Sequence, residues 1–116
     1  MSTDSSCLFC KIVRREIPAG ELFRDDDVVA FRDLNPQAPH HVLVIPTQHA
    51  ANLSRFVATA SAHAAQRILQ VCGEIGQEVG PQGYRVVTNE GGHGGQTVEH
   101  LHFHVLAGRS MSWPPG

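Results

Sequence analysis

The strictest pattern of polar and apolar positions lies near the C-terminal end of the chain, where three histidines alternate with three apolar residues in the order His100, Leu101, His102, Phe103, His104 and Val105. A period of two predicts a half-buried β-strand with one apolar face and one face of imidazoles. Residues two apart on a strand are separated by about 6.6 Å, so one zinc ion reaches two neighbouring histidines but not all three. At least one histidine is left for another role, unless the strand simply exposes a polar face.

Other patterns predict the rest of the fold. Residues 9–15 carry apolar positions on one helical face, and Pro18 and Gly20 are expected to end that short helix. Between Ser61 and Val79 the apolar and small positions recur at helical spacing, which predicts one long amphipathic helix. Apolar runs predict four more strands, over residues 21–24, 28–33, 41–45 and 84–89.

The connections between these strands are short, which favours antiparallel neighbours. The predicted fold class is α+β, an antiparallel sheet of about five strands with one long helix and a short N-terminal helix. With 116 residues, the chain is long enough for one domain, expected over residues 7–116 after a flexible N-terminus at residues 1–6.

Composition narrows the classes of function. The formal net charge of −2 provides no basic face for nucleic acid. No apolar run approaches the roughly 20 residues of a membrane span, and residues 1–6 lack the features of a signal peptide. We therefore expect a cytoplasmic protein without a nucleic-acid or membrane partner.

Two of the three cysteines, Cys7 and Cys10, form a C-x-x-C pair that favours metal binding or redox chemistry. A thioredoxin-like pair would follow a buried strand, and only six residues precede Cys7. Cys72 falls within the long helix and is interpreted as a small apolar core residue. The odd number of cysteines is typical of a reducing compartment.

A glycine-rich stretch precedes the histidines. Four of residues 91–95 are glycine, and Gln96 and Thr97 follow. Glycine allows backbone N–H groups to approach an anion closely, so this stretch is a candidate phosphate-binding loop. An ordinary hairpin connection is the alternative.

The stretch from Gly94 to Leu106 resembles the His-x-His-x-His signature of the histidine triad (HIT) family of nucleotide-binding proteins. The similarity extends over nearly the whole chain and favours the Hint branch, through residues 8–12, 31–39, 41–46, 89–91 and 113–116. The resemblance implies a HIT-like fold, two-fold homodimers, and a purine nucleotide partner such as a conjugate of AMP or GMP.

The resemblance also assigns roles to residues. His102 matches the family's nucleophile, which forms a covalent nucleotidyl-histidine, and His104 matches a residue that contacts the phosphate and delivers a proton. His41 is expected to support them. The implied reaction is hydrolysis of purine nucleoside 5′-monophosphoramidates or related nucleotide conjugates, without a catalytic metal.

Asp33 matches the aspartate that binds the ribose hydroxyls, although a turn-capping aspartate is the simpler interpretation. Thr97 stands where Hint relatives usually have serine. From the sequence alone the apolar members of the nucleotide set are simply core residues. The full nucleotide-binding set that the resemblance implies is Leu8, Phe9, Ile12, Phe31, Asp33, Leu34, Asn35, Leu43, Asn89, Gly95, Gln96 and Thr97.

Cys7, Cys10, His49 and His100 match the zinc ligands of those family members that keep the paired cysteines. Two thiolates and two imidazoles make a closed tetrahedral site, so the expected cofactor is structural zinc. A redox pair or an idle pair of cysteines remains the alternative.

Two other functions stay open. One is hydrolysis of dinucleoside polyphosphates, as in the related Fhit branch, although the terminal sequence Trp-Pro-Pro-Gly favours Hint. The other is a nucleotide-binding module, stabilised by structural zinc, that acts through protein partners and has only residual turnover.

Overall fold

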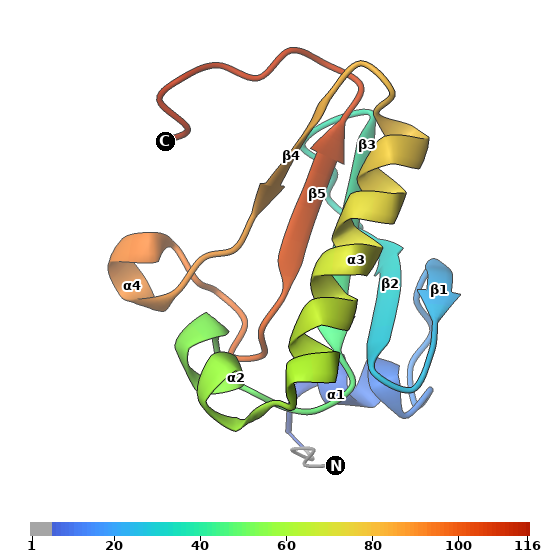
Figure 1. Cartoon of the computed structure of the whole chain (residues 1–116), viewed down its shortest axis with the longest axis vertical. Helices are drawn as coiled ribbons and strands as arrows, with labels where there is room; N and C mark the ends of the chain where they lie inside the picture. Colours follow the sequence, from blue (N-terminus) through green and yellow to red (C-terminus); the bar gives the residue numbers. More distant parts are fainter. Residues whose placement is uncertain (1–5) are drawn as a thin grey trace.

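The computed structural model describes residues 6–116, in which five antiparallel strands form one sheet in the order β1-β2-β3-β5-β4 (Figure 1). The predicted α+β class and antiparallel sheet are confirmed. Residues 1–5 of the segment predicted to be flexible lie outside the described residues. The strands are β1 Glu21–Arg24, β2 Val28–Arg32, β3 His40–Pro46, β4 Tyr84–Val87 and β5 Phe103–Ala107.

The helices are α1 Leu8–Val13, α2 Leu53–Thr59, α3 Ala62–Val79 and α4 Gly91–Gly94. The long helix α3 agrees with the prediction, and the Ser61 hydroxyl caps it by accepting from the N–H of Ala64. Helices α2 and α4 were not predicted. Within the described residues, no helix combines the length and apolar character needed to cross a membrane.

The two faces of the sheet pack against different helices (Figure 1). On β3, Val42 and Val44 belong to the core cluster that includes residues of α3, whereas Leu43 and Ile45 belong to the cluster that includes residues of α1. Apolar side chains on both faces explain why this strand appears in the sequence as a nearly continuous apolar run. The face that carries α1 also carries the candidate site.

The histidine segment differs from the prediction. β5 begins only at Phe103, so His100 and His102 precede the strand. The backbone N–H of Leu101 donates to the Ala50 carbonyl and not to β3, and His102 Nδ1 bonds the His100 carbonyl at 2.8 Å. Because these bonds turn residues 100–102 away from the ladder, the histidines do not share one exposed imidazole face. His100 and His102 are both buried.

Other boundaries move by a few residues. Helix α1 ends at Val13, before the predicted stop at Pro18, because Arg15 adopts a left-handed conformation with φ 60°. The N–H groups of Arg15 and Glu16 then bond the carbonyls of Ile12 and Lys11, which is a Schellman ending. The strands predicted over 28–33 and 84–89 end at Arg32 and Val87, where pairing with their neighbours stops.

Candidate active site and metal centre

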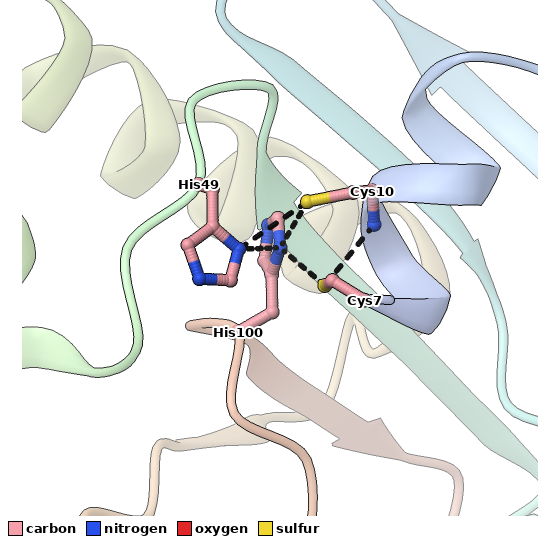
Figure 2. Close-up of side chains that lie close together, drawn as sticks. All are labelled: Cys7, Cys10, His49 and His100. Atoms are coloured by element: carbon pink, nitrogen blue, oxygen red, sulfur yellow. Dashed lines mark hydrogen bonds between the residues drawn. The ribbon is translucent and has the colours of Figure 1, made fainter. Parts of the chain in front are cut away.

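Cys7, Cys10, His49 and His100 converge from three separate segments of the chain (Figure 2). Cys7 is the N-cap of α1 and Cys10 lies within that helix, His49 follows β3, and His100 precedes β5. His100 Nδ1 lies 3.2 Å from Cys7 Sγ, 3.5 Å from Cys10 Sγ and 3.2 Å from His49 Nδ1. Cys10 Sγ lies 3.2 Å from His49 Nδ1.

This donor set fits a tetrahedral zinc ion. Bond lengths of about 2.3 Å to sulfur and 2.0–2.1 Å to nitrogen place tetrahedral ligand atoms roughly 3.3–3.8 Å apart, close to the observed separations. His100 Nε2 lies 3.0 Å from the Pro46 carbonyl, which can only accept, so the ring proton sits on Nε2. The Nδ1 lone pair therefore faces the cluster, as a metal ligand requires.

His102, His104 and His41 form the second group of imidazoles. The carbonyl of His100 fixes the proton of His102 on Nδ1, so His102 Nε2 carries a free lone pair in the neutral ring. The rings of His102 and His104 are 5.1 Å apart between centroids. The structure thus brings the predicted nucleophile beside the predicted proton donor.

A backbone N–H determines the protons of the other two rings. The N–H of Gln37 donates to His41 Nδ1 at 3.0 Å, so neutral His41 carries its proton on Nε2. His41 Nε2 then donates to His104 Nδ1 at 2.8 Å, which leaves the His104 proton on Nε2. His41 therefore holds His104 so that the outer nitrogen, Nε2, carries the proton and can donate a hydrogen bond.

Burial keeps this pair of histidines neutral. Burial, together with the nearby rings of His102 and His41, lowers the pKa of His104 to about 4, against the opposing attraction of Asp33. The pKa of His41 is also lowered by burial, again against the attraction of Asp33. At pH 7 the two rings donate hydrogen bonds as neutral groups.

Asp33, His41 and His104 also lie close enough together to suggest a second metal centre. The hydrogen bonds argue against one. A metal on His41 Nε2 would need the ring proton on Nδ1, where it would oppose the N–H of Gln37. Asp33 instead accepts from the backbone N–H of Asn35 at 2.8 Å and lies 3.4 Å from His41 Nε2.

A largely apolar pocket of about 280 Å³ lies beside these histidines. Phe9 connects the pocket to the histidines, because its ring packs edge-on against Phe31 in the pocket and against His102. Leu8 and Leu34 are not core residues, since they are 51% and 97% exposed at the pocket. The pocket contains seven of the predicted nucleotide-binding residues, namely Leu8, Phe9, Ile12, Phe31, Asp33, Leu34 and Leu43.

Sequence reasoning missed one wall of this pocket, formed by residues 17–20. Pro18 and Gly20 break regular structure, so the sequence pattern predicts only that a helix ends here. Ile17 and Ala19 pack against the cluster of α1, and this was the available signal, an apolar residue on each side of Pro18.

The glycine-rich loop is held by side chains rather than by the sheet. Gln96 Nε2 donates to the carbonyls of Ala51 and Val98, and Gln96 Oε1 accepts from the N–H of Gly91. The Gln96 amide therefore shapes the loop. Thr97 lines a hollow next to Cys7 and His49 and is not among the residues that line the apolar pocket.

Asn89 is half-buried between two fixed neighbours. The Thr88 hydroxyl donates to the His102 carbonyl at 2.9 Å, and the Glu90 carboxylate accepts from both the N–H and the hydroxyl of Ser54. Asn89 is thus held in the segment beside His102. Asn35 is exposed next to Asp33, and Gly95 ends α4 with a left-handed φ of 82°.

Comparisons with known proteins identify the family of this chain. A model of the HIT domain matches residues 14–111. The 14 kDa zinc-binding protein of Zea mays is 42% identical, with 97% of this chain and 90% of that protein aligned. Adenylylsulfatase HINT1 of Arabidopsis thaliana is 39% identical, over 98% of this chain and 79% of that protein.

Among solved structures, a HIT family hydrolase from Legionella pneumophila Philadelphia 1 superposes with a TM-score of 0.89. It is 46% identical, and the match covers 95% of this chain and 99% of that chain. Residues 14–111, which the HIT domain model matches, contain the histidine segment, all five strands of the sheet and the long helix. The chain therefore belongs to the histidine triad (HIT) family of nucleotide-binding hydrolases.

Proposed function

We propose that this protein hydrolyses purine nucleoside 5′-monophosphoramidates or related nucleotide conjugates, through a nucleotide bound covalently to His102. The observation that carries the proposal is the free lone pair on His102 Nε2, beside an apolar pocket large enough for a base and next to a neutral hydrogen-bond donor on His104. A nucleophile, a hydrogen-bond donor to the reacting group and a binding pocket are the parts that such a reaction needs.

In the first step, His102 Nε2 attacks the α-phosphorus and the bond from phosphorus to the leaving nitrogen breaks. The leaving nitrogen takes a proton from solvent and departs as the amine, while neutral His104 keeps its Nε2 proton and donates a hydrogen bond to it; the His41–His104 hydrogen bond holds that donor in place. The His102 ring becomes positive when Nε2 binds phosphorus. The His100 carbonyl, which accepts from His102 Nδ1, stabilises that charge.

In the second step, water attacks the phosphorus, the P–N bond to His102 breaks, and the nucleoside monophosphate leaves. The attacking water releases one proton to solvent, and the His102 ring becomes neutral again when the electron pair of the P–N bond returns to Nε2. Asp33 binds the ribose hydroxyls at the mouth of the pocket. Asn89, Gly95 and the N–H groups of the loop contact the phosphate, and the Gln96 amide holds the loop through its own hydrogen bonds. Thr97 lines the hollow next to Cys7 and His49 and takes no part in this contact.

We propose that the four-residue cluster binds structural zinc. Two thiolates and two imidazoles fill four coordination positions, whereas a catalytic zinc keeps one position open for water. The zinc-binding relative in Zea mays supports the choice of metal.

The choice of leaving group needs a direct comparison. The relative in Arabidopsis is named an adenylylsulfatase, which favours adenylyl sulfate as a second substrate of the same site. Turnover is measured for adenosine 5′-phosphoramidate, adenylyl sulfate and a diadenosine polyphosphate. We expect the highest kcat/KM with the phosphoramidate. A preference for the polyphosphate favours the Fhit-like alternative, and no turnover of any of them favours a binding module.

A two-fold dimer stays a prediction that the exposed edge of the sheet supports. β4 is an edge strand, and Tyr84 and Val86 on it remain 39% and 40% exposed in the single chain. Edge strands with unpaired N–H and C=O groups commonly pair with another chain. Analytical ultracentrifugation, which measures the mass of the assembly in solution, tests the dimer directly.

A cytoplasmic location also stays a prediction.

We expect Asp33→Ala to weaken binding of AMP by about tenfold more than binding of its 2′,3′-dideoxy analogue, because a carboxylate makes strong hydrogen bonds to two vicinal hydroxyls. Titration calorimetry with both ligands measures the difference. Asp33→Asn is the matched control for the turn, since its amide oxygen still accepts from Asn35. Equal losses for the two ligands would show that Asp33 only shapes the turn.

A further inference from the structure

Arg24 connects the edge of the sheet to the helix that forms one wall of the base pocket. It is the last residue of the edge strand β1, and its Nη1 donates to the Val13 carbonyl at 2.9 Å while Nη2 donates to the Ile12 carbonyl at 3.2 Å. The neighbouring Phe23 packs against the cluster on the α3 side. Alternation along β1 thus directs Arg24 towards α1.

The bond to Val13 completes the end of α1. A helix leaves its last four carbonyl groups without partners of its own. In α1 the carbonyls of residues 10–12 accept from the backbone N–H groups of residues 14–16. The fourth carbonyl, that of Val13, accepts from Arg24. The guanidinium also places a positive charge at the C-terminal end of the helix, which is the favourable end for a cation.

Glu21 holds the guanidinium in this orientation. Its Oε1 accepts from Arg24 Nη2 at 2.7 Å, and both carboxylate oxygens lie 3.2 Å from Arg24 Nε. The hydrogen bond from Arg24 lowers the pKa of Glu21, so the carboxylate stays ionised at neutral pH. A planar guanidinium bonded on several sides has little rotational freedom left, which makes it a precise support.

Helix α1 depends on such supports because it has only six residues. A helix of this length is not stable alone in water, so tertiary contacts decide where it lies. The cysteines of the metal cluster hold its beginning, Phe9 and Ile12 pack against the sheet, and Arg24 holds its end. Phe9 and Ile12 also line the base pocket.

We propose that Arg24 is a positioning residue for base recognition, which fixes the end of α1 so that Phe9 and Ile12 keep the width of the pocket. This inference rests on the proposed function, because it takes the pocket to bind a purine. Arg24 acts on the base and not on the phosphate. His102 and His104 are held by their own bonds to the His100 carbonyl and to His41.

The test compares ligands with and without the base. Arg24→Met keeps most of the side-chain length but removes the hydrogen bonds. We expect its Kd for AMP to rise by about five- to tenfold and its Kd for ribose 5-phosphate to change by less than about twofold. With adenosine 5′-phosphoramidate, KM rises and kcat stays within about twofold. Arg55→Met, an exposed arginine on α2, is the charge-matched control and binds both ligands as the wild type does.

Two further variants keep the proposal testable if Arg24→Met does not fold. Glu21→Gln weakens the hold on the Arg24 guanidinium while Arg24 itself remains. We therefore expect a smaller loss of affinity than in Arg24→Met, for AMP and not for ribose 5-phosphate. Arg24→Lys restores one donor and should recover part of the AMP affinity. Unchanged AMP affinity in the folded variants, or equal losses for AMP and ribose 5-phosphate, would overturn the inference. A wild-type protein that does not bind AMP would instead overturn the proposed function.

Discussion

Replacing His102 with alanine is expected to reduce turnover by at least about a thousandfold while AMP still binds within a fewfold of the wild-type affinity. The substitution removes the lone pair that attacks phosphorus, and no neighbouring ring can replace it. His104 Nδ1 accepts from His41, and its other nitrogen carries the proton. The base pocket and Asp33 remain, so binding survives.

His40→Ala is the matched control, because His40 is an exposed histidine on β3 that makes no part of the proposed chemistry. It should retain full turnover. The covalent intermediate is sought separately, by mixing wild-type enzyme with substrate labelled at the α-phosphate and denaturing it at alkaline pH, where a P–N bond to histidine persists. Label on the wild type and none on His102→Ala is expected. A His102→Ala variant with near-normal turnover would reject the nucleophile assignment.

Sequence patterns predicted the elements whose buried residues follow a regular pattern along the chain. Helix α3 has an apolar stripe over its whole length, and β3 is apolar on both faces, so both were found with nearly correct boundaries. Helix α2 was missed because Phe56 is its one buried residue among the seven. Helix α4 was missed because three of its four residues are glycine, which disfavours helix formation in general.

The candidate site was predicted as a set of residues, not as a set of hydrogen bonds. Alternation suggested that the three histidines share one face, but three different partners divide them. His100 faces the metal cluster, His102 bonds a carbonyl two residues back, and His104 bonds His41. These partners come from residues distant in sequence or from backbone groups. The Gln37 N–H that determines the His41 tautomer leaves no signal in the pattern.

Sequence reasoning also misjudged which residues near the pocket are buried. An apolar residue normally indicates a core position, yet Leu34 is almost fully exposed beside Asp33. A ligand that covers Leu34 would bury this surface, so its exposure fits a binding pocket better than a core. The contact of Arg24 with α1 leaves no signal in the sequence, because a single arginine at the end of a strand is normally an ordinary surface residue.

The double variant Cys7→Ser with Cys10→Ser is expected to lose its zinc and to melt about 10 °C lower than the parent. An ion that binds only the folded state stabilises it by mass action, by about 3 kcal/mol when free zinc exceeds its Kd by a few hundredfold. Metal analysis on protein prepared without a histidine tag and thermal unfolding measure both effects. Cys72→Ala should keep its zinc, since Cys72 lies on the buried face of α3 and is not part of the metal cluster.

Below its new melting temperature the double variant should retain substantial turnover, because His102, His104 and His41 are held by hydrogen bonds that do not include the cluster cysteines. Some loss of AMP affinity is expected, since α1 loses the support at its beginning while Arg24 still holds its end. Absence of zinc from the parent protein would reject the metal site. Loss of all turnover from a folded double variant would reject a purely structural role, because the chemistry assigned to His102 and His104 needs no ligand from the metal cluster.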